Sequence, residues 1–211
     1  MFNVCAQCGI YDEEKHIDPS GPWAICPHCN HAHRFVQLPL FVLTGASGAG
    51  KSSVCLYLPW ALPECVCLEN DILWRTEFAT PDDNYRSYRN MWLRVAKNVA
   101  QAGRPVVLCG TALPDQFEAC PERRYFTQLH YLALVCDDDL LAARLRARPA
   151  WRGAGGDAFV DTMTAFNRWI KANAATTQPP MSLLDTTTSS VEQSVAHVAA
   201  WVRERLASER S

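Results

Sequence analysis

The sequence contains no apolar run that approaches the roughly 20 residues needed to cross a bilayer, so we expect no transmembrane segment. Its first residues lack a basic region followed by an apolar one, and we therefore expect no secretory signal peptide and a cytoplasmic protein. The formal net charge is only −2, which gives no electrostatic reason to expect nucleic acid or an anionic membrane as the main partner. Internal repeats and low-complexity tracts are also absent from the sequence.

The composition suits one folded domain of ordinary size with a small attachment. Apolar residues occupy 48% of the 211 positions, enough for a hydrophobic core, and 20% of the residues are charged, which argues against global disorder. Ten cysteines are present, and four of them form two C-x-x-C pairs near the N-terminus. The other six are expected to be reduced and mostly buried: Cys55, Cys65, Cys67, Cys109, Cys120 and Cys136.

Residues 45–52 read G-A-S-G-A-G-K-S and match the phosphate-binding pattern G-x-x-x-x-G-K-S, known as the P-loop. An apolar run at 40–44 predicts a strand before the pattern, and residues 52–58 predict a helix after it, which Pro59 is expected to end. A strand, a glycine-rich loop and a helix are the context that the pattern requires. The alternative, a flexible glycine loop without a ligand, is disfavoured by Lys51 and by these flanking elements.

The P-loop predicts a nucleoside triphosphate as ligand, with ATP expected. Glycines let consecutive N–H groups turn toward phosphate oxygens, and the helix N-terminus adds partial positive charge. Lys51 would reach the β- and γ-phosphates, and the Ser52 hydroxyl would ligate Mg²⁺. The candidate nucleotide-binding residues of this segment are Gly45, Ala46, Ser47, Gly48, Ala49, Gly50, Lys51, Ser52 and Ser53.

The two C-x-x-C pairs predict a structural Zn²⁺ site with four thiolate ligands. Cys5 and Cys8 are separated from Cys26 and Cys29 by 17 residues, a spacing typical of zinc ribbons. The stretch between the pairs is polar, so we expect residues 1–37 to need the metal in order to fold. Three histidines near the second pair could compete as ligands, although we favour the four cysteines: His28, His31 and His33.

The charge of the predicted ribbon bears on its role. Two basic and four acidic residues give it a net charge of −2: Lys15, Arg34, Asp12, Glu13, Glu14 and Asp18. This balance disfavours nucleic acid as a partner. We therefore expect a structural appendage or a surface that contacts a protein partner.

Acidic side chains follow the second predicted strand, at 65–69. Glu69 and Asp71 lie at its C-terminal end, the edge where ligands bind in open α/β sheets. Asp71 is predicted to hold Mg²⁺ or to accept the proton of a substrate hydroxyl, and the alternative is an N-cap for the following turn. Glu69 is the weaker candidate, because alternation along the strand can point it elsewhere.

The third predicted strand, at 105–109, ends in Gly110 and Thr111. Many P-loop ATPases carry the acid that orients Mg²⁺ at this position, and this chain has none there. Asp71 is therefore the best candidate for that role.

The remaining chain predicts two more strands and four more helices. The strands are expected at 129–136 and 181–184, and the helices at 84–102, 114–119, 157–173 and 190–207. A further short helix is expected after the fourth strand, with Asp137 near its N-cap. Five strands that alternate with helices predict an α/β fold with a parallel sheet covered on both faces.

The helix after the fourth strand carries Arg144 and Arg148, four residues apart and so on one face. The chain then runs through Arg152 into a glycine-rich stretch. Planar guanidinium groups suit a transferring phosphate, so residues 144–157 predict a mobile lid whose three arginines bind the nucleotide. The alternative is an ordinary basic helix end. Two further arginines are weaker candidates for substrate contact: Arg75 and Arg89.

Four motifs together resemble those of the small P-loop kinases, a group that includes shikimate kinase, gluconate kinase, chloramphenicol phosphotransferase and the nucleoside and nucleotide kinases. They are G-A-S-G-A-G-K-S after the first strand, E-N-D after the second, R-L-R-A-R-P-A-W-R after the fourth and D-T-T before the last helix. The resemblance covers residues 38–208.

The resemblance implies a P-loop NTPase three-layer sandwich with a five-stranded parallel sheet in the order 2-3-1-4-5. It also implies that Arg144, Arg148 and Arg152 close over ATP and that Asp71 acts on the acceptor hydroxyl or on Mg²⁺. The turn at 185–188 would lie near the adenine. Two features depart from the usual plan: the N-terminal ribbon is additional, and the acceptor-site motifs of the named enzymes are not recognisable.

We expect a zinc ribbon at 1–37 and a P-loop kinase-like domain at 38–211. The favoured function is transfer of the γ-phosphoryl group of ATP to a hydroxyl of a small molecule that is nucleoside-like, sugar-like or antibiotic-like. The alternative is a nucleotide-binding regulatory adaptor that presents the ribbon to a partner. A nucleic-acid end kinase is disfavoured by the charge of the ribbon. Proteins of this build also carry the general label of AAA-type ATPases, although the D-E pair of an AAA module is missing after the third strand.

Overall fold

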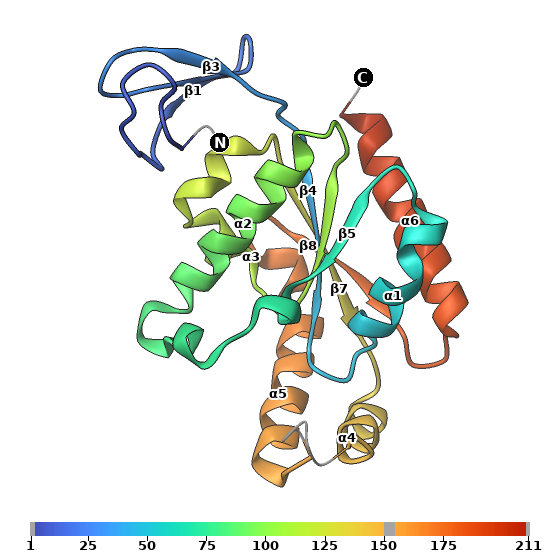
Figure 1. Ribbon diagram of the computed structural model, residues 1–211. Coiled ribbons are helices and arrows are strands. Elements are labelled where there is room, and N and C mark those ends of the chain that lie inside the picture. Colours follow the sequence, from blue (N-terminus) through green and yellow to red (C-terminus); the bar gives the residue numbers. More distant parts are fainter. Residues whose placement is uncertain (1–2, 150–154, 210–211) are drawn as a thin grey trace.

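The computed structural model describes residues 3–149 and 155–209, which form a three-layer α/β body with a small extension at one end (Figure 1). The central sheet has five parallel strands in the spatial order β5-β6-β4-β7-β8. Counted along the chain within this sheet, that order is 2-3-1-4-5, as the resemblance implies. The strands are β4 (Leu40–Gly45), β5 (Val66–Glu69), β6 (Val106–Cys109), β7 (Leu129–Val135) and β8 (Met181–Asp185).

Helices cover both faces of the sheet because the central strands are apolar on both sides. Every residue of β4 and β6 is buried. Phe41 and Leu43 pack with α1 (Lys51–Ala61) and α6 (Val191–Ser208) on one face, whereas Leu40 and Val42 pack on the other face. The second face is covered by α2 (Arg86–Ala100), α3 (Pro114–Glu118) and part of α5 (Asp157–Asn173). Successive side chains of a strand point to opposite faces, so these runs predict a doubly covered sheet.

The helices follow the predicted ranges closely, with one exception at Pro59. We expected Pro59 to end α1, but the helix continues to Ala61, and the N–H of Leu62 donates to the carbonyl of Leu58. Leu58 and Leu62 are both fully buried, and their packing against the sheet favours the extra turn. None of the helices within residues 3–149 and 155–209 combines the length and apolar character that a membrane span requires.

The link between β5 and α2 was not predicted in detail. It forms three short 3₁₀ turns, at Asn70–Leu73, Thr76–Phe78 and Pro81–Asp83. The chain then passes through Asn84 and Tyr85, whose φ angles are +55° and +57°, before α2 begins. This left-handed backbone is uncommon for residues other than glycine, and it fixes the direction in which α2 starts.

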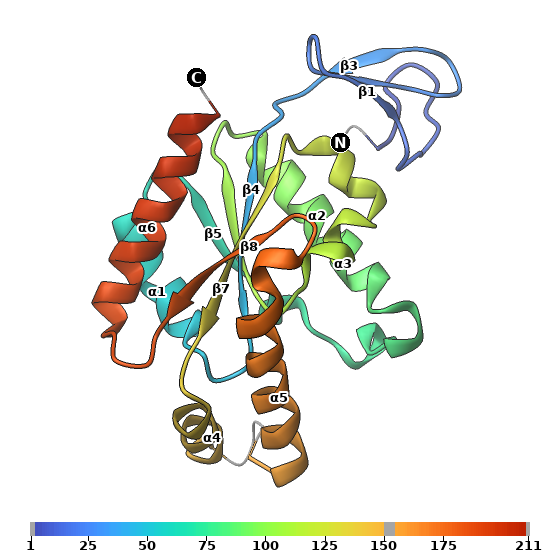
Figure 2. The same ribbon diagram turned by 180° about the vertical axis from the view of Figure 1, so that it is seen from behind.

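The N-terminal extension is a three-stranded antiparallel sheet of β1 (His16–Asp18), β2 (Trp23–Ile25) and β3 (Ala32–Arg34). It lies beside the end of the large sheet where β4 begins, away from the end where the P-loop follows β4 (Figures 1 and 2). Its apolar contacts include Ala24 and Phe35, which pack against Tyr125 of the large domain. The extension therefore shares a core with the rest of the chain.

Buried charged groups also join the extension to the large domain. Glu122 is fully buried, and its two carboxylate oxygens accept hydrogen bonds from Asn3 at 2.8 Å and Lys97 at 2.5 Å. Arg94 donates to the same carboxylate at 2.8 Å and also to Glu13 of the extension. Since Arg94 and Lys97 belong to α2, this helix is held at its C-terminal half by the extension.

Candidate functional site

The P-loop connects β4 to α1 and requires glycine at its first position. Gly45 has a φ of +136°, and a Cβ atom there would lie 2.3 Å from the carbonyl oxygen of Leu134. Gly50 is the N-cap of α1 with a φ of +102°, so the loop curls directly into the helix. Consecutive N–H groups and the helix N-terminus then favour an anion inside the curl.

Lys51 begins α1 and turns back over the loop. Its Nζ donates to the carbonyl oxygens of Gly45 at 2.7 Å and Ala46 at 3.1 Å. Burial lowers the pKa of Lys51 to about 8, and the nearby Asp71 carboxylate opposes that shift. A half-buried ammonium whose hydrogen-bond acceptors are neutral carbonyls is stabilised by a negatively charged ligand, because phosphate oxygens form stronger, charge-assisted hydrogen bonds.

The P-loop lines a cavity of about 490 Å³. This volume is typical of small-molecule sites. Arg144 of α4 (Asp138–Arg146) borders it and donates weakly, at 3.4 Å, to the carbonyls of Gly48 and Thr186. The buried Thr186 hydroxyl donates to the carbonyl of Ala49 at 3.1 Å. The turn after β8 is thereby attached to the P-loop, and its Ser189 also lines the cavity. The turn at 185–188 thus adjoins the predicted nucleotide.

The arginines of the expected lid take different positions. Arg144 lies in the last turn of α4, while Arg148 lies two residues beyond its end, so they do not share one helix face as predicted. Both nevertheless line the cavity around the P-loop. Asp137 caps α4 as expected, since its carboxylate accepts from the N–H groups of Asp139 and Leu140. Arg152 lies outside the described residues, as does the central part of the 144–157 segment.

Glu69 contacts the P-loop directly, which sequence reasoning did not anticipate. The Ser52 hydroxyl donates to Glu69 Oε1 at 2.5 Å. Glu69 was the weaker candidate because alternation along β5 can point its side chain elsewhere, but in the structure its carboxylate meets Ser52 at the start of α1. The sequence feature that could have indicated this contact was the place of Glu69 in the E-N-D motif. The hydroxyl and carboxylate form a set of hard oxygen donors that fits Mg²⁺.

Asp71 also lines the cavity around the P-loop, where it lies close enough to raise the pKa of Lys51. Its side chain is exposed and accepts no hydrogen bond from any residue that the structure describes. The 3₁₀ turn that contains it begins after Glu69 and has no side-chain cap, so the N-cap alternative for Asp71 is wrong. The carboxylate is free to meet a ligand.

The end of β6 explains why no acid is present there. A Cβ atom on Gly110 would lie 1.8 Å from the side-chain nitrogen of Asn70. Any larger residue at 110 would therefore displace Asn70, which is 6% exposed. The neighbouring Thr111 hydroxyl donates to the carbonyl of Gly45 at 3.2 Å. The acids near the P-loop come instead from the end of β5.

A second cavity, of about 910 Å³, opens beside the first. The two share seven lining residues: Ser47, Ser52, Glu69, Asn70, Asp71, Thr111 and Arg148. Beyond this junction the second cavity has a largely aromatic lining: Trp74, Tyr85, Tyr88, Trp92, Phe117 and Phe159. Arg89 also borders the second cavity, whereas Arg75 borders neither. The sequence analysis did not predict this cavity.

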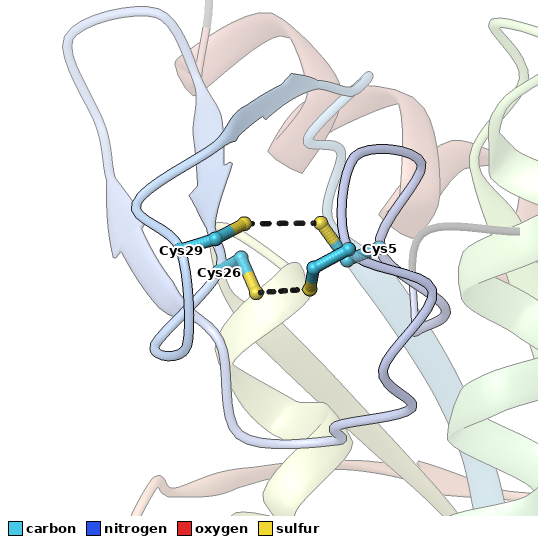
Figure 3. Close-up of side chains that lie close together, drawn as sticks. Cys5, Cys26 and Cys29 are labelled. Atoms are coloured by element: carbon cyan, nitrogen blue, oxygen red, sulfur yellow. Dashed lines mark hydrogen bonds between the residues drawn. The ribbon is translucent and has the colours of Figure 1, made fainter.

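The four predicted zinc ligands lie together, with all their Sγ atoms within 4.8 Å of one another. Cys5 and Cys29 Sγ are 3.6 Å apart, and Cys8 and Cys26 Sγ are 3.8 Å apart (Figure 3). These distances are too long for disulfides, and they match the edge of about 3.8 Å expected for tetrahedral sulfurs each about 2.3 Å from Zn²⁺. The cluster is compatible with a structural zinc ion.

The histidines near the second cysteine pair make other contacts. His28 Nε2 lies 2.9 Å from a carboxylate oxygen of Asp12, and the His31 and His33 rings pack edge to face. The metal-binding cluster within the described residues contains the four cysteines alone. This agrees with our preference for cysteine ligands over histidine.

Comparison with known proteins gives a family and a set of similar folds. The family described as AAA domain, AAA_18, matches residues 42–154, more than half of the chain. A gluconokinase from Sinorhizobium meliloti 1021 aligns at a TM-score of 0.58 and 20% identity, covering 85% of this chain and 100% of that one. A comparison with curated protein sequences gives no match.

Two further solved structures align less closely. A sugar kinase from Janibacter sp. HTCC2649 gives a TM-score of 0.57 at 16% identity, covering 80% of this chain and 95% of that one. The YorR protein from Bacillus subtilis, solved in complex with phosphorylated GDP, gives 0.51 at 16% identity, with 78% and 95% covered. At these identities the likeness concerns the fold.

Proposed function

Because the chain belongs to the AAA domain family AAA_18 and has the fold of the small P-loop kinases, we propose that it is an ATP-dependent kinase acting on a hydroxyl of a small metabolite. The observation that carries the proposal is the junction of the two cavities. Ser47, Ser52, Asp71 and Arg148 line both the cavity around the P-loop and the neighbouring one. A phosphoryl donor in the first and a hydroxyl compound in the second would meet at these residues.

The donor cavity offers groups for each part of the triphosphate. The P-loop N–H groups and Lys51 would bind the β- and γ-phosphates, and the turn after β8 would adjoin the adenine. Arg144 and Arg148 would stabilise the charge that spreads over the transferring phosphoryl group. Binding would replace the carbonyl partners of Lys51 with phosphate oxygens, a stronger charge-assisted interaction.

The metal and the acceptor would use different acids. The Ser52 hydroxyl and the adjacent Glu69 carboxylate would hold Mg²⁺, which neutralises charge on the β- and γ-phosphates when bound. Asp71 would orient the acceptor hydroxyl and take its proton, because its carboxylate borders both cavities and makes no hydrogen bond to the described residues. This division revises the expectation that Asp71 serves both roles.

The ribbon and the lid complete the proposal. We assign residues 1–37 to a zinc ribbon and 38–211 to the kinase domain, with the lid at about 144–157. Closure of the lid would exclude water and so suppress hydrolysis of ATP. The ribbon lies at the end of the sheet away from the P-loop, so its proposed role is structural, through the contacts of its Asn3 and Glu13 with Lys97 and Arg94 of α2.

A screen of hydroxyl compounds with ATP and Mg²⁺ tests this function. We expect at least one nucleoside, sugar, sugar acid or aminoglycoside-like alcohol to be phosphorylated by the wild type and by Arg203→Ala, a surface control that breaks only the Glu64 pair and a contact with Ala61. Lys51→Ala should abolish the transfer. If the protein binds ATP but phosphorylates nothing, the adaptor alternative replaces the kinase. Phosphorylation of a nucleic-acid end alone would select the end-kinase alternative.

A further inference from the structure

Resting on the kinase function proposed above, we propose that the phosphoryl acceptor is an alcohol built on a planar aromatic ring that carries a carbonyl or carboxylate oxygen. The ring would lie among the aromatic side chains of the second cavity, and its hydroxyl would lie at the junction beside Asp71. The inference depends on three features of this cavity: its aromatic wall, the buried amide of Asn70 and the guanidinium of Arg89.

The aromatic wall is continuous from the deep part of the cavity to its mouth. Trp92 and Phe117 are buried at 1% and 2% exposure, and Trp74 stands at the mouth with 46% of its surface exposed. The ring of Tyr88 joins them, edge to face, at 5.1 Å from Trp74 and 6.5 Å from Trp92. Binding of a flat apolar ring against this wall is favourable, because the rings stack and apolar surface is removed from water.

A polyol would fit this wall poorly. Beyond the junction the lining offers few hydrogen-bond partners, among them the indole N–H of Trp92 and the guanidinium of Arg89. Most hydroxyl groups of a polyol would therefore leave water without a new partner, which is costly. The three acidic or amide side chains among the described residues that border the cavity, Glu69, Asn70 and Asp71, are all at the junction with the donor cavity. The cavity is therefore polar at one end and aromatic at the other, which matches a ring with a hydroxyl-bearing arm.

The backbone holds the aromatic wall in a strained arrangement. Tyr85 adopts a φ of +57°, an uncommon conformation for an aromatic residue, and its ring centroid lies 6.1 Å from that of Trp74. The Tyr88 hydroxyl donates to the carbonyl of Asn70, so the first residue of the link after β5 is tied to α2. These contacts bring the rings of the 70–85 link and of α2 to one cavity.

Two polar groups identify where the oxygen atoms of the acceptor would lie. The Asn70 side chain is 6% exposed, borders both cavities, and makes no hydrogen bond to the residues described. It is placed to meet the arm that bears the hydroxyl. Arg89 donates to the carbonyl of Asn84 at 2.7 Å and to Gln116 Oε1 at 2.5 Å, which fixes the guanidinium.

Arg89 carries its charge beside the cavity without a carboxylate partner among the described residues. Both of its hydrogen-bond acceptors are neutral, and its Nε–H has no acceptor. A carbonyl or carboxylate oxygen on the ring would lie in the field of this cation. The guanidinium already lies over the Tyr85 ring, with Cζ 5.4 Å from the ring centroid, and such an oxygen would add a charge-assisted acceptor for its Nε–H.

Phosphoryl transfer to such an alcohol involves ATP, the acceptor hydroxyl and the Asp71 carboxylate. The bond between the γ-phosphorus and the bridging oxygen of ATP breaks, and a bond from the acceptor oxygen to that phosphorus forms. The hydroxyl proton passes to the Asp71 carboxylate, and ADP leaves with the bridging oxygen. No oxidant, reductant or further co-reactant takes part.

The test compares three sets of alcohols with the full-length protein: aromatic alcohols with a ring oxygen acceptor (uridine and 4-(hydroxymethyl)benzoate), aromatic alcohols without one (benzyl alcohol and 2-phenylethanol), and non-aromatic ones (gluconate, shikimate and glycerol). We expect kcat/KM for the first set to exceed that for the non-aromatic set by at least tenfold. Equal or higher kcat/KM for the non-aromatic set would overturn the inference.

Two pairs of variants locate the binding groups. Trp74→Ala should raise the KM for the first set about tenfold while leaving the KM for ATP unchanged, and Trp60→Ala, at a 76% exposed position outside both cavities, should change neither. Arg89→Met should raise the KM for the first set and not for benzyl alcohol, whereas Arg86→Met on the same helix should have no effect. An unchanged KM in both Trp74→Ala and Arg89→Met would remove the proposed site.

Binding calorimetry separates this inference from the kinase function. If no alcohol is phosphorylated but the first set still binds in a Trp74-dependent way, the kinase function fails and the aromatic site stands. If non-aromatic alcohols are phosphorylated and the first set neither binds nor reacts, the kinase function stands and the aromatic site fails.

Discussion

The Ser52 hydroxyl lies 2.5 Å from Oε1 of Glu69, so the P-loop and the last residue of β5 are joined by a direct hydrogen bond. This pair places an acid next to the serine that is expected to hold Mg²⁺. Asp71, two residues further along, has no such partner among the described residues and faces both cavities. The two carboxylates are therefore assigned separate tasks, and each assignment can be tested by removing one negative charge.

Glu69→Gln should raise the Mg²⁺ concentration needed for half-maximal activity by roughly 10- to 100-fold, since the amide keeps the shape but loses the charge beside the metal site. The activity at saturating Mg²⁺ should change much less. Asp71→Asn should instead lower kcat by roughly 10²- to 10⁴-fold without changing the Mg²⁺ requirement, because it removes the proton acceptor. Mg²⁺ titrations of both variants check this, and the opposite pattern would exchange the two roles.

Nucleotide binding should be coupled to proton uptake through Lys51. Burial lowers the pKa of Lys51 to about 8, so the free protein at pH 8.5–9 holds this side chain largely neutral. Phosphate oxygens favour the ammonium and raise its pKa, and ATP binding should therefore take up close to one proton in that range and almost none at pH 6.5.

Calorimetry in buffers of different ionisation enthalpy measures this uptake. Lys51→Arg provides the matched control, because a guanidinium stays charged over the whole pH range and has no proton to gain. The variant should bind ATP without the pH-dependent uptake. Equal uptake by the variant and the wild type at pH 9 would show that another group is responsible.

The cysteine cluster should hold one zinc ion per chain. Cys29→Ser should reduce the bound zinc and lower the unfolding temperature, because it replaces one of four thiolate ligands at an exposed position. Cys67→Ser, outside the cluster, should leave the zinc content at the wild-type value. Elemental analysis of the purified proteins gives the answer, and wild-type protein without zinc would contradict the assignment.

Much of this architecture could be predicted from the sequence because it depends on local chemistry. The apolar runs around Leu40 and Val106 give the buried strands, the G-x-x-x-x-G-K-S pattern gives the curled loop, and Asp137 caps its helix as its position suggests. The spacing of the cysteines likewise predicts the cluster of Sγ atoms. The strands, the loop and the cap are each decided within a few residues of chain, and the cluster follows from two short C-x-x-C pairs.

The second cavity and the orientation of Glu69 could not be predicted in the same way. The aromatic wall combines the 70–85 link, α2, α3 and α5, and only tertiary packing brings Trp74 beside Tyr88. The direction of Glu69 depends on how α1 approaches the end of β5. The helix around Pro59 is a third case in which tertiary packing decides the structure. The buried contacts of Leu58 and Leu62 favour a helix that the local sequence would end earlier.

The buried carboxylate of Glu122 should be important for stability and for the position of the ribbon. Glu122→Ala leaves Lys97, which is 1% exposed, without its ion-pair partner, and should lower the free energy of unfolding by about 3–5 kcal/mol. Glu64→Ala breaks the exposed pair with Arg203 and should cost only about 0–1 kcal/mol. Urea unfolding of the two variants compares them, and similar losses would refute the idea that this network anchors the ribbon to α2.

The central claim, that the protein is a kinase, is tested most directly by following the γ-phosphoryl group of ATP. The measurement compares the phosphate that appears on an added alcohol with the phosphate released to water, in the wild type and in Lys51→Ala. The account predicts ADP formation that depends on the alcohol, an equal amount of phosphorylated product, and loss of both in the variant. ATP hydrolysis that is unaffected by every alcohol in the screen, or nucleotide binding without turnover, would contradict it.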